Sequence, residues 1–360
     1  MYCIVVHIDN ILSTFLNKRF FLTGNTGFKG TWLSHILIKN SIESLGFSIA
    51  PAGIGRLGYD PGLVIPTKIG DVLDLPNLEQ AMGNFLPQVV IHFAAQSLMQ
   101  KSYKFPRETF EVNVVGTYNV LESAIKTKSV ETVLIITSDK VYSPNILNHY
   151  VSEDANLGGK DPYSASKAAA EMVTEIIKAV NNQQNLGINI ITGRAGNVIG
   201  GGDQAENRLL PDIIKSLSTG SNIELRNPAQ IRPWQHVLES LYGYMSYINY
   251  SYQNSQVPSA LNFGPSENDH LSVKEVAKLG CQYWNSRESK IVNVLTDLPP
   301  ENKQILLNSE LAKKTLGWTP KWDVNQSVKL TIDWWKKFKD LKNKNDVCEL
   351  YTDDIKLFFQ

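Results

Sequence analysis

The stretch FFLTGNTGFKG, residues 20–30, decides the fold of this chain. Its first four residues, 20–23, are apolar or β-branched and predict a buried strand, and the glycines that follow predict a tight turn. Apolar residues over 33–37 then recur at the spacing of one helix face. A strand, a glycine-rich turn and a helix make up the first part of a βαβ unit, which predicts a parallel sheet.

The same alternation continues outward from this stretch. Further strands are predicted at 44–49, 88–95, 132–137 and 188–192. Helices are predicted between them, at 106–126 and 163–180. Short apolar runs that alternate with helical patterns are typical of strands buried on both faces. We therefore predict a Rossmann-type α/β fold with a doubly wound parallel sheet.

The alternation ends after residue 195, where four glycines occur between residues 196 and 202. Short predicted strands and helices then follow in irregular order, which indicates a smaller, mixed α/β C-terminal substrate lobe. The predicted division is an atypical N-terminal segment (1–17), a Rossmann domain for a dinucleotide (18–195, with segments returning near 236–265), a mainly substrate-binding lobe (196–345) and a C-terminal tail (346–360).

Composition excludes several classes of protein. The 360 residues contain 35 Lys and Arg and 35 Asp and Glu, and this absence of net charge disfavours a nucleic-acid partner. The three cysteines, Cys3, Cys281 and Cys348, are scattered, and the six histidines lack ligand spacing, so we expect no disulfide framework and no metal site. A reducing cytoplasm fits this cysteine usage. No apolar run approaches the length of a membrane span, and the N-terminus lacks a basic region typical of a signal peptide.

The glycine-rich turn predicts a dinucleotide site. Glycine lets a pyrophosphate approach the free N–H groups at the start of the following helix. The acid that usually reads the adenosine ribose does not end the 44–49 strand, so NAD and NADP both remain open. Asp71 follows the next strand, where it could contact an adenine amino group or cap a turn.

A second set of residues predicts proton transfer. Tyr163 and Lys167 stand at i and i+4 and share one helix face. A nearby ammonium stabilises phenolate and so lowers a tyrosine pKa, which lets the phenol accept a proton from a sugar hydroxyl. Ser138 ends the preceding predicted strand, at the edge where such sheets bind ligands.

These motifs resemble the extended short-chain dehydrogenase/reductases and, within them, the CDP-glucose 4,6-dehydratase family. The resemblance covers residues 18–335, and its departures are Asn25, where histidine is expected, together with residues 1–17 and 41–66. The motifs that carry it are TGNTGFKG (23–30), HFAAQ (92–96), TSDK (137–140), DPYSASK (161–167), RAGNVIGGGD (194–203) and RPWQHV (232–237).

The resemblance implies a nicotinamide cofactor, NAD, that is retained through the catalytic cycle. It also implies an elimination of water between C5 and C6 of a nucleotide sugar. Asp139 would protonate the leaving C6 hydroxyl, which requires a raised pKa, and Lys140 would remove the C5 proton, which requires a lowered one. A plain salt bridge between the two is the structural alternative. The residues expected to contact the cofactor are Gly24, Thr26, Gly27, Phe28, Lys29, Gly30, Asp71, Val72, Phe93, Ala94, Ala95, Tyr163 and Lys167.

Substrate contacts are expected mainly in the second lobe. Arg232 is a natural partner for a diphosphate, because a guanidinium grips phosphate oxygens in pairs. Asn197 matches an asparagine that relatives use to hold the diphosphate. Arg208, Arg226 and Gln96 are further candidates, and each arginine could instead be a solvated surface residue. The choice of cytosine rests on the resemblance alone.

Two other functions use the same fold. A nucleotide-sugar 4-epimerase would need Ser138, Tyr163 and Lys167 but not the Asp139–Lys140 pair. A non-catalytic NAD-binding protein would need none of these together, and function cannot be read from fold alone. The resemblance also implies a homodimer, or a dimer of dimers, formed through the predicted helices 106–126 and 163–180.

Overall fold

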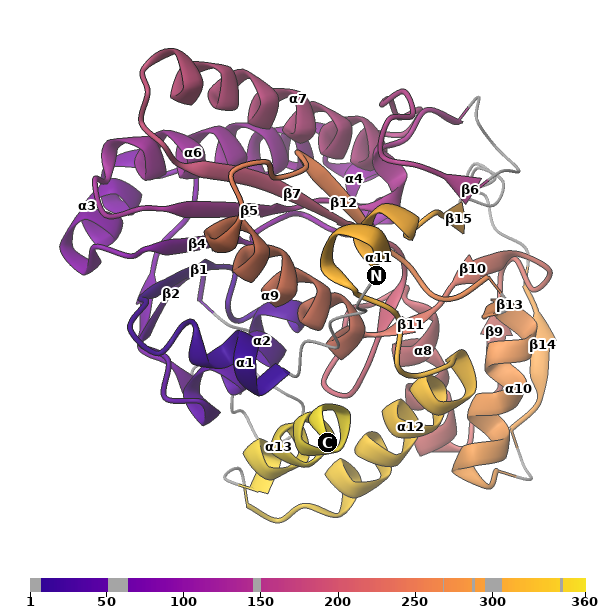
Figure 1. The fold of residues 1–360 in the computed structure, drawn as a ribbon. Helices are drawn as coiled ribbons and strands as arrows, with labels where there is room; N and C mark the ends of the chain where they lie inside the picture. Colours follow the sequence, from indigo (N-terminus) through magenta and orange to yellow (C-terminus); the bar gives the residue numbers. More distant parts are fainter. Residues whose placement is uncertain are drawn as a thin grey trace.

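A seven-stranded parallel sheet forms the centre of the molecule (Figure 1). The computed structural model describes residues 8–50, 64–144, 150–267, 269–286, 289–294, 306–343 and 346–360. The sheet strands are β1 (Phe20–Thr23), β2 (Ser44–Ser48), β3 (Thr67–Ile69), β4 (Val89–His92), β5 (Thr132–Ile136), β7 (Asn189–Ala195) and β12 (Ala260–Phe263). Their order across the sheet is β12-β7-β5-β4-β1-β2-β3, and every pair is parallel. The predicted doubly wound parallel sheet is therefore confirmed.

The order reverses between β1 and β4, and this reversal places the loops after β1, β4 and β5 beside one another. Thr23, the last residue of β1, stands in register with His92, the last residue of β4. His92 is in turn in register with Ile135 near the end of β5. In open parallel sheets the crevice at such a reversal is where ligands bind.

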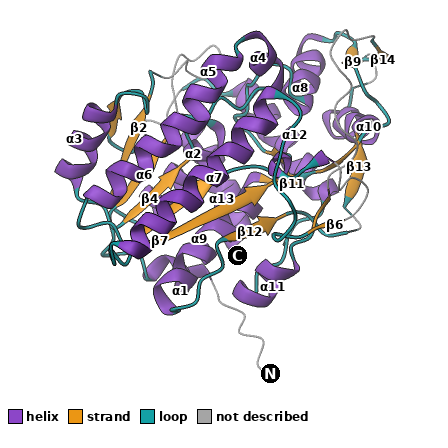
Figure 2. Ribbon diagram, turned by 90° about the horizontal axis from the view of Figure 1, so that it is seen from above, coloured by secondary structure: helices purple, strands orange, loops and turns teal. Residues whose placement is uncertain are grey.

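Both faces of the sheet are covered by helices, which explains the apolar strands. Phe20 and Leu22 belong to one core and Phe21 to the other, as successive side chains on a strand must. One face carries α3 (Leu75–Phe85), α6 (Gly116–Lys126) and α7 (Pro162–Gln183), and the views of Figures 1 and 2 show α6 and α7 running side by side. The other face carries α1 (Ile8–Ser13), α2 (Phe28–Lys39) and α9 (Val237–Gln253).

The predicted helix at 106–126 is interrupted. It consists of α5 (Pro106–Phe110), a π-helical turn, η3 (Glu111–Val115), and α6, and the short helix α4 (Met99–Lys104) precedes it. A π turn inserts one extra residue into a helix and is frequent at functional sites. Here it contains the buried Asn113.

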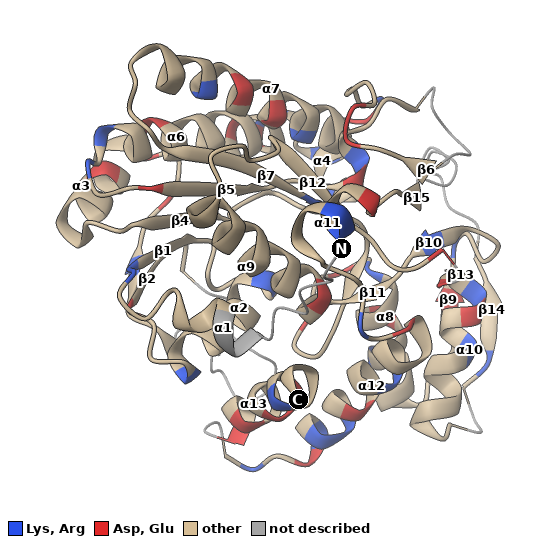
Figure 3. Cartoon of the chain, in the orientation of Figure 1, with Lys and Arg blue, Asp and Glu red and all other residues tan. Residues whose placement is uncertain are grey.

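The C-terminal lobe has a core of its own around Ile213, Val276 and Val328. Its helices are α8 (Leu209–Thr219), α10 (Val273–Trp284) and α12 (Val324–Asp340). Short strands pair around them and around α11 (Glu310–Leu316): β6 (Tyr150–Val151), β8 (Val198–Ile199), β9 (Ile223–Leu225), β10 (Ile231–Pro233), β11 (Gln235–His236), β13 (His270–Ser272), β14 (Ile291–Asn293) and β15 (Leu306–Leu307). Basic and acidic residues are interspersed along α7, α10 and α12, in keeping with the zero net charge (Figure 3).

Segments near both ends of the chain pack against the sheet domain. Residues 346–360, expected as a tail, contain the helix α13 (Asp346–Phe359). The Tyr351 ring of α13 lies 4.7 Å from Trp32 and stacks on His35 at 4.3 Å, both on α2. Near the other end, Phe15 is fully buried and packs edge-to-face on Phe20 at 5.2 Å.

Candidate active site

The turn between β1 and α2 forms one wall of the candidate site, and glycine is required there for two reasons. Gly24 has a φ of +71°, and a Cβ on it would lie 2.7 Å from the backbone nitrogen of Ala94. A Cβ on Gly30 would lie 2.3 Å from the carbonyl oxygen of Gly24. Gly27 is the N-cap of α2, no side chain caps this end, and a Cβ on Gly27 would meet only the Gly24 oxygen at 3.3 Å. The turn therefore packs closely against residues 93–94 and leaves the start of α2 open to an anion.

Lys29, in the first turn of α2, points into the protein interior. Its Nζ donates a hydrogen bond to the Tyr244 hydroxyl at 2.9 Å. Burial, with smaller contributions from the charges of Lys167 and Arg208, lowers the Lys29 pKa to about 7, while Asp139 opposes them. These influences show that Lys29 faces the predicted catalytic groups.

The adenosine end of the predicted cofactor site is formed by the ends of β2 and β3. Asp71 follows β3, and its Oδ1 accepts a hydrogen bond from the Leu73 backbone at 2.9 Å, so it closes a turn. The carbonyl of Val72 accepts from Asn119 at 2.9 Å. Thr26 shares a hydrogen bond of 2.7 Å with Ser48, which ends β2 in place of the usual acid.

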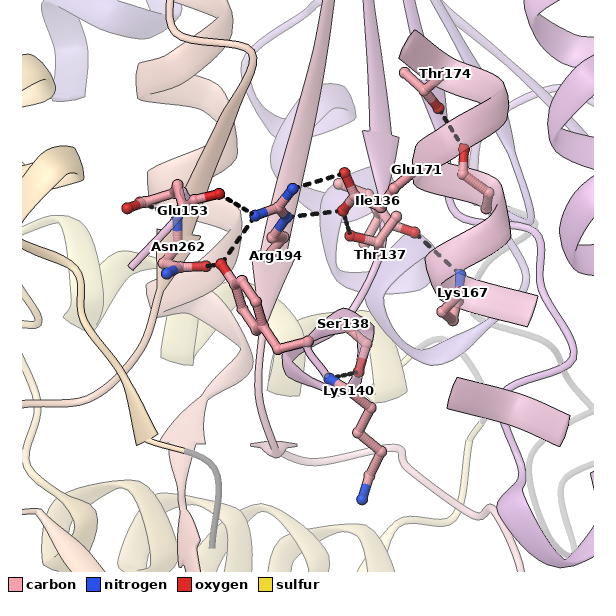
Figure 4. Close-up of polar contacts among 12 residues, drawn as sticks. Ile136, Thr137, Ser138, Lys140, Glu153, Lys167, Glu171, Thr174, Arg194 and Asn262 are labelled. Carbon is pink, nitrogen blue, oxygen red and sulfur yellow. Dashed lines mark hydrogen bonds and ion pairs between the residues drawn. The ribbon is translucent and has the colours of Figure 1, made fainter. Parts of the chain in front are cut away.

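Tyr163 and Lys167 lie on one face of α7, which begins with a strong start signal. Asp161 caps the helix by accepting from the Ser164 backbone at 2.9 Å, and Pro162 occupies the first turn. Burial raises the Tyr163 pKa, and a hydrogen bond with Ser138 partly offsets this. Burial lowers the Lys167 pKa to about 8, and its Nζ donates to the Ile136 carbonyl at 3.1 Å (Figure 4).

The end of β5 carries the predicted acid and base in a short 3₁₀ turn, η4 (Asp139–Val141). The Ser138 hydroxyl donates to Asp139 Oδ1 at 2.8 Å and accepts from the Lys140 backbone at 3.2 Å. Burial and the neighbouring charge of Arg232 together lower the Lys140 pKa to about 8, while Asp139 and Asp161 oppose them. A buried amine that loses its proton this readily can act as a base near neutral pH.

Asn113 connects the helix layer to this site. Its Oδ1 accepts from the Gln96 backbone at 2.8 Å, and its Nδ2 donates to the Gln96 carbonyl at 3.0 Å and to Ser166 at 2.9 Å. Ser166 in turn donates to the carbonyl of Tyr163 at 2.7 Å. The Gln96 side chain itself bonds to Leu98 and Thr109, so its amide closes the turn after β4.

The predicted substrate residues fall into two groups. Arg232 and Arg208 lie with the catalytic set, since their charges act on Lys140 and Lys29 respectively. Arg208 also donates to Asp203 at 3.3 Å and to Ser97 at 3.1 Å, and so joins the lobe to the loop after β4. Asn197 is half-buried beside β11, and its carbonyl accepts from the Gln235 backbone at 3.1 Å.

Arg226 is held differently from the other two arginines. Its guanidinium lies 3.6 Å from Asp212 on α8, with both side chains partly exposed. None of the charge effects described for the catalytic residues comes from it. The structure therefore groups Arg226 with α8 rather than with the catalytic set.

Sequence reasoning missed a buried ion pair behind Lys167. Arg194, on β7, donates from Nε and Nη2 to the two carboxylate oxygens of Glu171, on α7, at 2.9 and 3.0 Å (Figure 4). Glu171 stands four residues after Lys167, and this spacing is the signal that could have revealed it. Within the described ranges, no cluster of three metal-ligating side chains occurs, and no helix has the length and apolar character needed to cross a membrane.

Comparison with known sequences shows one family over most of the chain. A family profile described as GDP-mannose 4,6 dehydratase matches residues 21–331. A CDP-glucose 4,6-dehydratase from Salmonella typhimurium is 35% identical over 327 residues, covering 89% of this chain and 90% of that protein. A dTDP-glucose 4,6-dehydratase from Haemophilus influenzae is 25% identical over 338 residues, covering 87% and 96%.

Solved structures show the same fold at lower identity. A dTDP-glucose 4,6-dehydratase from Streptomyces venezuelae, solved with NAD and TYD bound, has a TM-score of 0.75 and 21% identity, covering 89% of this chain and 97% of that chain. A UDP-glucose 4-epimerase from Thermotoga maritima has a TM-score of 0.77 and 19% identity, covering 89% and 100%. Dehydratases and epimerases share this architecture, so the fold does not distinguish between the two reactions.

Proposed function

The chain belongs to the GDP-mannose 4,6 dehydratase family, and from that premise we propose that it is an NAD-dependent hydro-lyase that converts CDP-glucose to CDP-4-dehydro-6-deoxy-glucose and water. The choice of CDP-glucose is supported by the 35% identity to the Salmonella typhimurium protein. The reaction class is supported by the side chains gathered at the end of β5.

The residues around the glycine-rich turn fit a nicotinamide dinucleotide. The uncapped start of α2 and the space beside Gly27 suit a diphosphate, and Gly24 with Ala94 would form the floor beneath it. Thr26, Phe28, Lys29, Gly30, Asp71, Val72, Phe93 and Ala95 complete the proposed cofactor contacts. The bound nicotinamide would supply hydride chemistry, accepting a hydride from C4 of the sugar and returning it to C6.

The first step is oxidation of the sugar at C4. Tyr163 accepts the proton of the O4 hydroxyl, and Ser138 donates a hydrogen bond to the same oxygen. The expected lowering of the Tyr163 pKa is not found, because burial raises it and the opposing charge comes from Arg208. The phenolate would therefore need added support from the ammonium group of Lys167, one helical turn away. The C–H bond at C4 breaks with its electron pair leaving as hydride, so that a 4-keto group remains.

The second step is loss of water. The 4-keto group acidifies the proton on C5, which Lys140 removes. The electron pair left at C5 forms the C5–C6 double bond as the C–O bond at C6 breaks, and Asp139 protonates the departing hydroxyl to give water. A proton returns to C5 from Lys140, while C6 would take up the hydride that the nicotinamide supplies. The O4 proton held by Tyr163 passes to Asp139, which restores both groups, so one water is lost overall.

The diphosphate of the substrate is assigned to the basic residues of the second lobe. Arg232 is buried close to Lys140, and burial lowers its pKa while Asp139 opposes this effect. A buried guanidinium of this kind gains from an anionic ligand that replaces its lost hydration. Arg208 and Asn197 extend the same side of the site.

The observation that carries the proposal is the Asp139–Lys140 pair beside Ser138. A 4-epimerase oxidises and reduces the same carbon and has no need of a second acid and base. In this chain Asp139 is buried, Lys140 is half-buried, and Lys140 has the lowered pKa that a base requires.

Mass spectrometry of nucleotide sugars tests the proposal. Purified protein is incubated with CDP-, dTDP-, UDP- and GDP-hexoses and NAD⁺, with Tyr163→Phe as a matched inactive control. Loss of one water from CDP-glucose alone is the expected result. Loss of water from another sugar would overturn the choice of nucleotide, and an isomer of unchanged mass would indicate the epimerase. No reaction with any of these sugars would favour a non-catalytic binding protein.

We also propose a cytoplasmic homodimer built on the helix face opposite the sheet. Exposed apolar side chains gather there on α4, α5, η3, α6 and α7: Tyr103, Phe105, Phe110, Val115, Tyr118, Met172 and Ile176. Met172 and Ile176 are 62% and 61% exposed, and an apolar patch of this kind is typical of a contact between proteins. Sedimentation analysis of the chain and of Met172→Glu, which should be monomeric, tests the assembly.

A further inference from the structure

The Glu171–Arg194 pair is built more tightly than a structural ion pair on a surface. Both side chains are nearly inaccessible, with 3% and 6% of their surfaces exposed. Two parallel N–H···O bonds fix the guanidinium against the carboxylate. An ion pair this deeply buried costs desolvation energy, so its presence calls for a reason beyond stability.

The pair connects every element that carries a proposed catalytic residue. Thr137, the residue before Ser138, donates to Glu171 Oε1 at 2.5 Å. Arg194 also donates to the Tyr142 hydroxyl at 2.9 Å, and Tyr142 stands two residues after Lys140. Tyr142 in turn donates to Asn262 at 2.6 Å (Figure 4). The pair thus ties α7 to both sides of the Ser138–Lys140 turn.

Glu171 also acts on Lys167 through its negative charge. Tyr163, Lys167 and Glu171 follow one another at intervals of four residues, on one face of α7. Burial lowers the Lys167 pKa, and Glu171 is the charge that raises it again. The other charged or titratable groups facing Lys167 are Lys29 on α2 and His92 on β4, whose own pKa values Lys167 lowers.

We propose that Glu171, held by Arg194 and Thr137, is a positioning residue that keeps the amine of Lys167 charged and fixed at the end of β5. The inference rests on the proposed function in one respect, since it is Tyr163 chemistry that needs a charged Lys167. Glu171 itself touches neither substrate nor cofactor in this scheme.

The test measures the titration of Lys167 in the protein without ligands. Lysine labelled with 13C at Cε gives one NMR signal per residue, and Lys167→Met assigns the signal. In Glu171→Gln the titration midpoint should fall by about one pH unit, because an opposite charge one helical turn away has been removed. Glu171→Asp keeps the charge and should restore most of the original midpoint.

Two further variants separate this effect from damage to the fold. Glu239→Gln makes the same change at a fully buried carboxylate on α9 that accepts from the backbone of Lys321 and Trp322. It should leave the Lys167 midpoint unchanged. Glu171→Gln combined with Arg194→Gln removes both buried charges, so it should fold even if the single variant does not, and its midpoint should also fall.

The activity measurement separates this inference from the proposed function. In Glu171→Gln, the alkaline limb of the kcat profile should move to lower pH together with the NMR midpoint. A dehydratase whose Lys167 midpoint is unchanged in the double variant would overturn the inference alone. A shifted midpoint in a protein that dehydrates no sugar would overturn the proposed function and leave the role of Glu171 toward Lys167 standing.

Discussion

Arg194 and Arg232 are both buried, with 5% and 8% of their surfaces exposed, yet the protein uses them in opposite ways. Burial disfavours the charge of Arg194, but the hydrogen bonds and charge of Glu171 raise its pKa above the ordinary value. Burial lowers the pKa of Arg232, and Asp139 opposes this only in part. The charge of Arg194 is met by Glu171 and joins two elements, whereas the charge of Arg232 acts on Lys140 and would favour an anionic ligand there.

Three lysines resemble Arg232 rather than Arg194 in this respect. Lys167 is buried, Lys29 and Lys140 are half-buried, and all three have a lowered pKa. Asp139 is a carboxylate whose charge acts on both Lys29 and Lys140. Cations of this kind would suit the two diphosphate-containing molecules of the proposed reaction.

The largest expected effect comes from removing Lys140, the proposed base at the end of β5. Lys140→Ala should lower turnover by about 10²–10⁴-fold, the usual contribution of a positioned base. Oxidation at C4 needs no base at C5, so reduced nicotinamide should accumulate and be visible by its absorbance. The free energy of unfolding should be unchanged or higher, because the variant lacks the desolvated charge of Lys140. Near-normal turnover would remove Lys140 from the mechanism. It would also weaken the distinction between the Glu171–Arg194 pair and the cations around Lys140.

Breaking the Glu171–Arg194 ion pair should mainly lower the free energy of unfolding. Arg194→Met leaves Glu171 buried without its cation and should cost about 3–5 kcal/mol of unfolding free energy. Urea unfolding followed by circular dichroism measures the loss. The double variant Glu171→Met and Arg194→Met should recover part of it, since an apolar pair can replace a buried ion pair. If Arg194→Met were as stable as the parent, the Glu171–Arg194 pair would not hold α7 against β7.

Arg232→Lys keeps the charge and removes the paired geometry. We expect KM for the nucleotide sugar to rise about 10–100-fold, as charge-assisted hydrogen bonds contribute about 1.5–3 kcal/mol. The value of kcat should fall much less, because the reacting carbons lie away from the diphosphate. Initial rates across substrate concentration separate the two constants. A fall in kcat with KM unchanged would assign Arg232 to the chemistry rather than to binding.

The pH dependence follows from the two lysines at the end of β5 and on α7. Lys140 must be neutral to act as a base, so elimination should speed up as pH rises through its pKa of about 8. Lys167 must be charged, so oxidation should slow as pH rises through its own pKa of about 8. Turnover should therefore peak near pH 8 and fall about tenfold per pH unit on either side. A plateau extending to high pH would exclude a charged Lys167.

The smallest effect is expected at Arg226. Its pair with Asp212 is partly exposed, and such surface pairs contribute at most about 1 kcal/mol. Arg226→Ala should therefore change KM by less than about fivefold, with stability nearly unaffected. Kinetics beside Arg232→Lys give the comparison directly. A loss as large as that of Arg232 would return Arg226 to the substrate site, where its place in the second lobe first suggested it.

The sheet domain was predictable because its local signals agree with one another. The run from Phe20 to Gly30 predicted β1, the turn and the start of α2, and Pro106 marked the start of α5. The sequence could not predict the π turn around Asn113, because a single inserted residue leaves the helical pattern intact. It also could not predict α9, which is buried nearly all round and so lacks the one-sided pattern of a surface helix.

The residues of the candidate site also divide into those with a local sequence signal and those without one. Ser138, Tyr163 and Lys167 are recognisable because strand ends and helix spacing bring them together. Their positions are those expected, but their roles remain predictions. Glu171 on α7 escaped notice because its partner, Arg194, comes from a distant strand, β7. Gln96 stays a predicted substrate residue, and its amide also closes a turn. Contacts between distant elements decide such cases, and local sequence does not contain them.

The packing of α13 against α2 has a consequence for how the protein is made. The helix that opens the nucleotide site leaves the ribosome early, whereas the helix that covers its Trp32 and His35 is synthesised almost a whole chain later. During translation the apolar back of α2 therefore lacks its Tyr351 cover, in a chain whose other sheet strands are already available to pair. Such long-range closure is slow and leaves intermediates open to aggregation. A nascent chain stalled before α13 should therefore depend on chaperones until Tyr351 can cover Trp32 and His35.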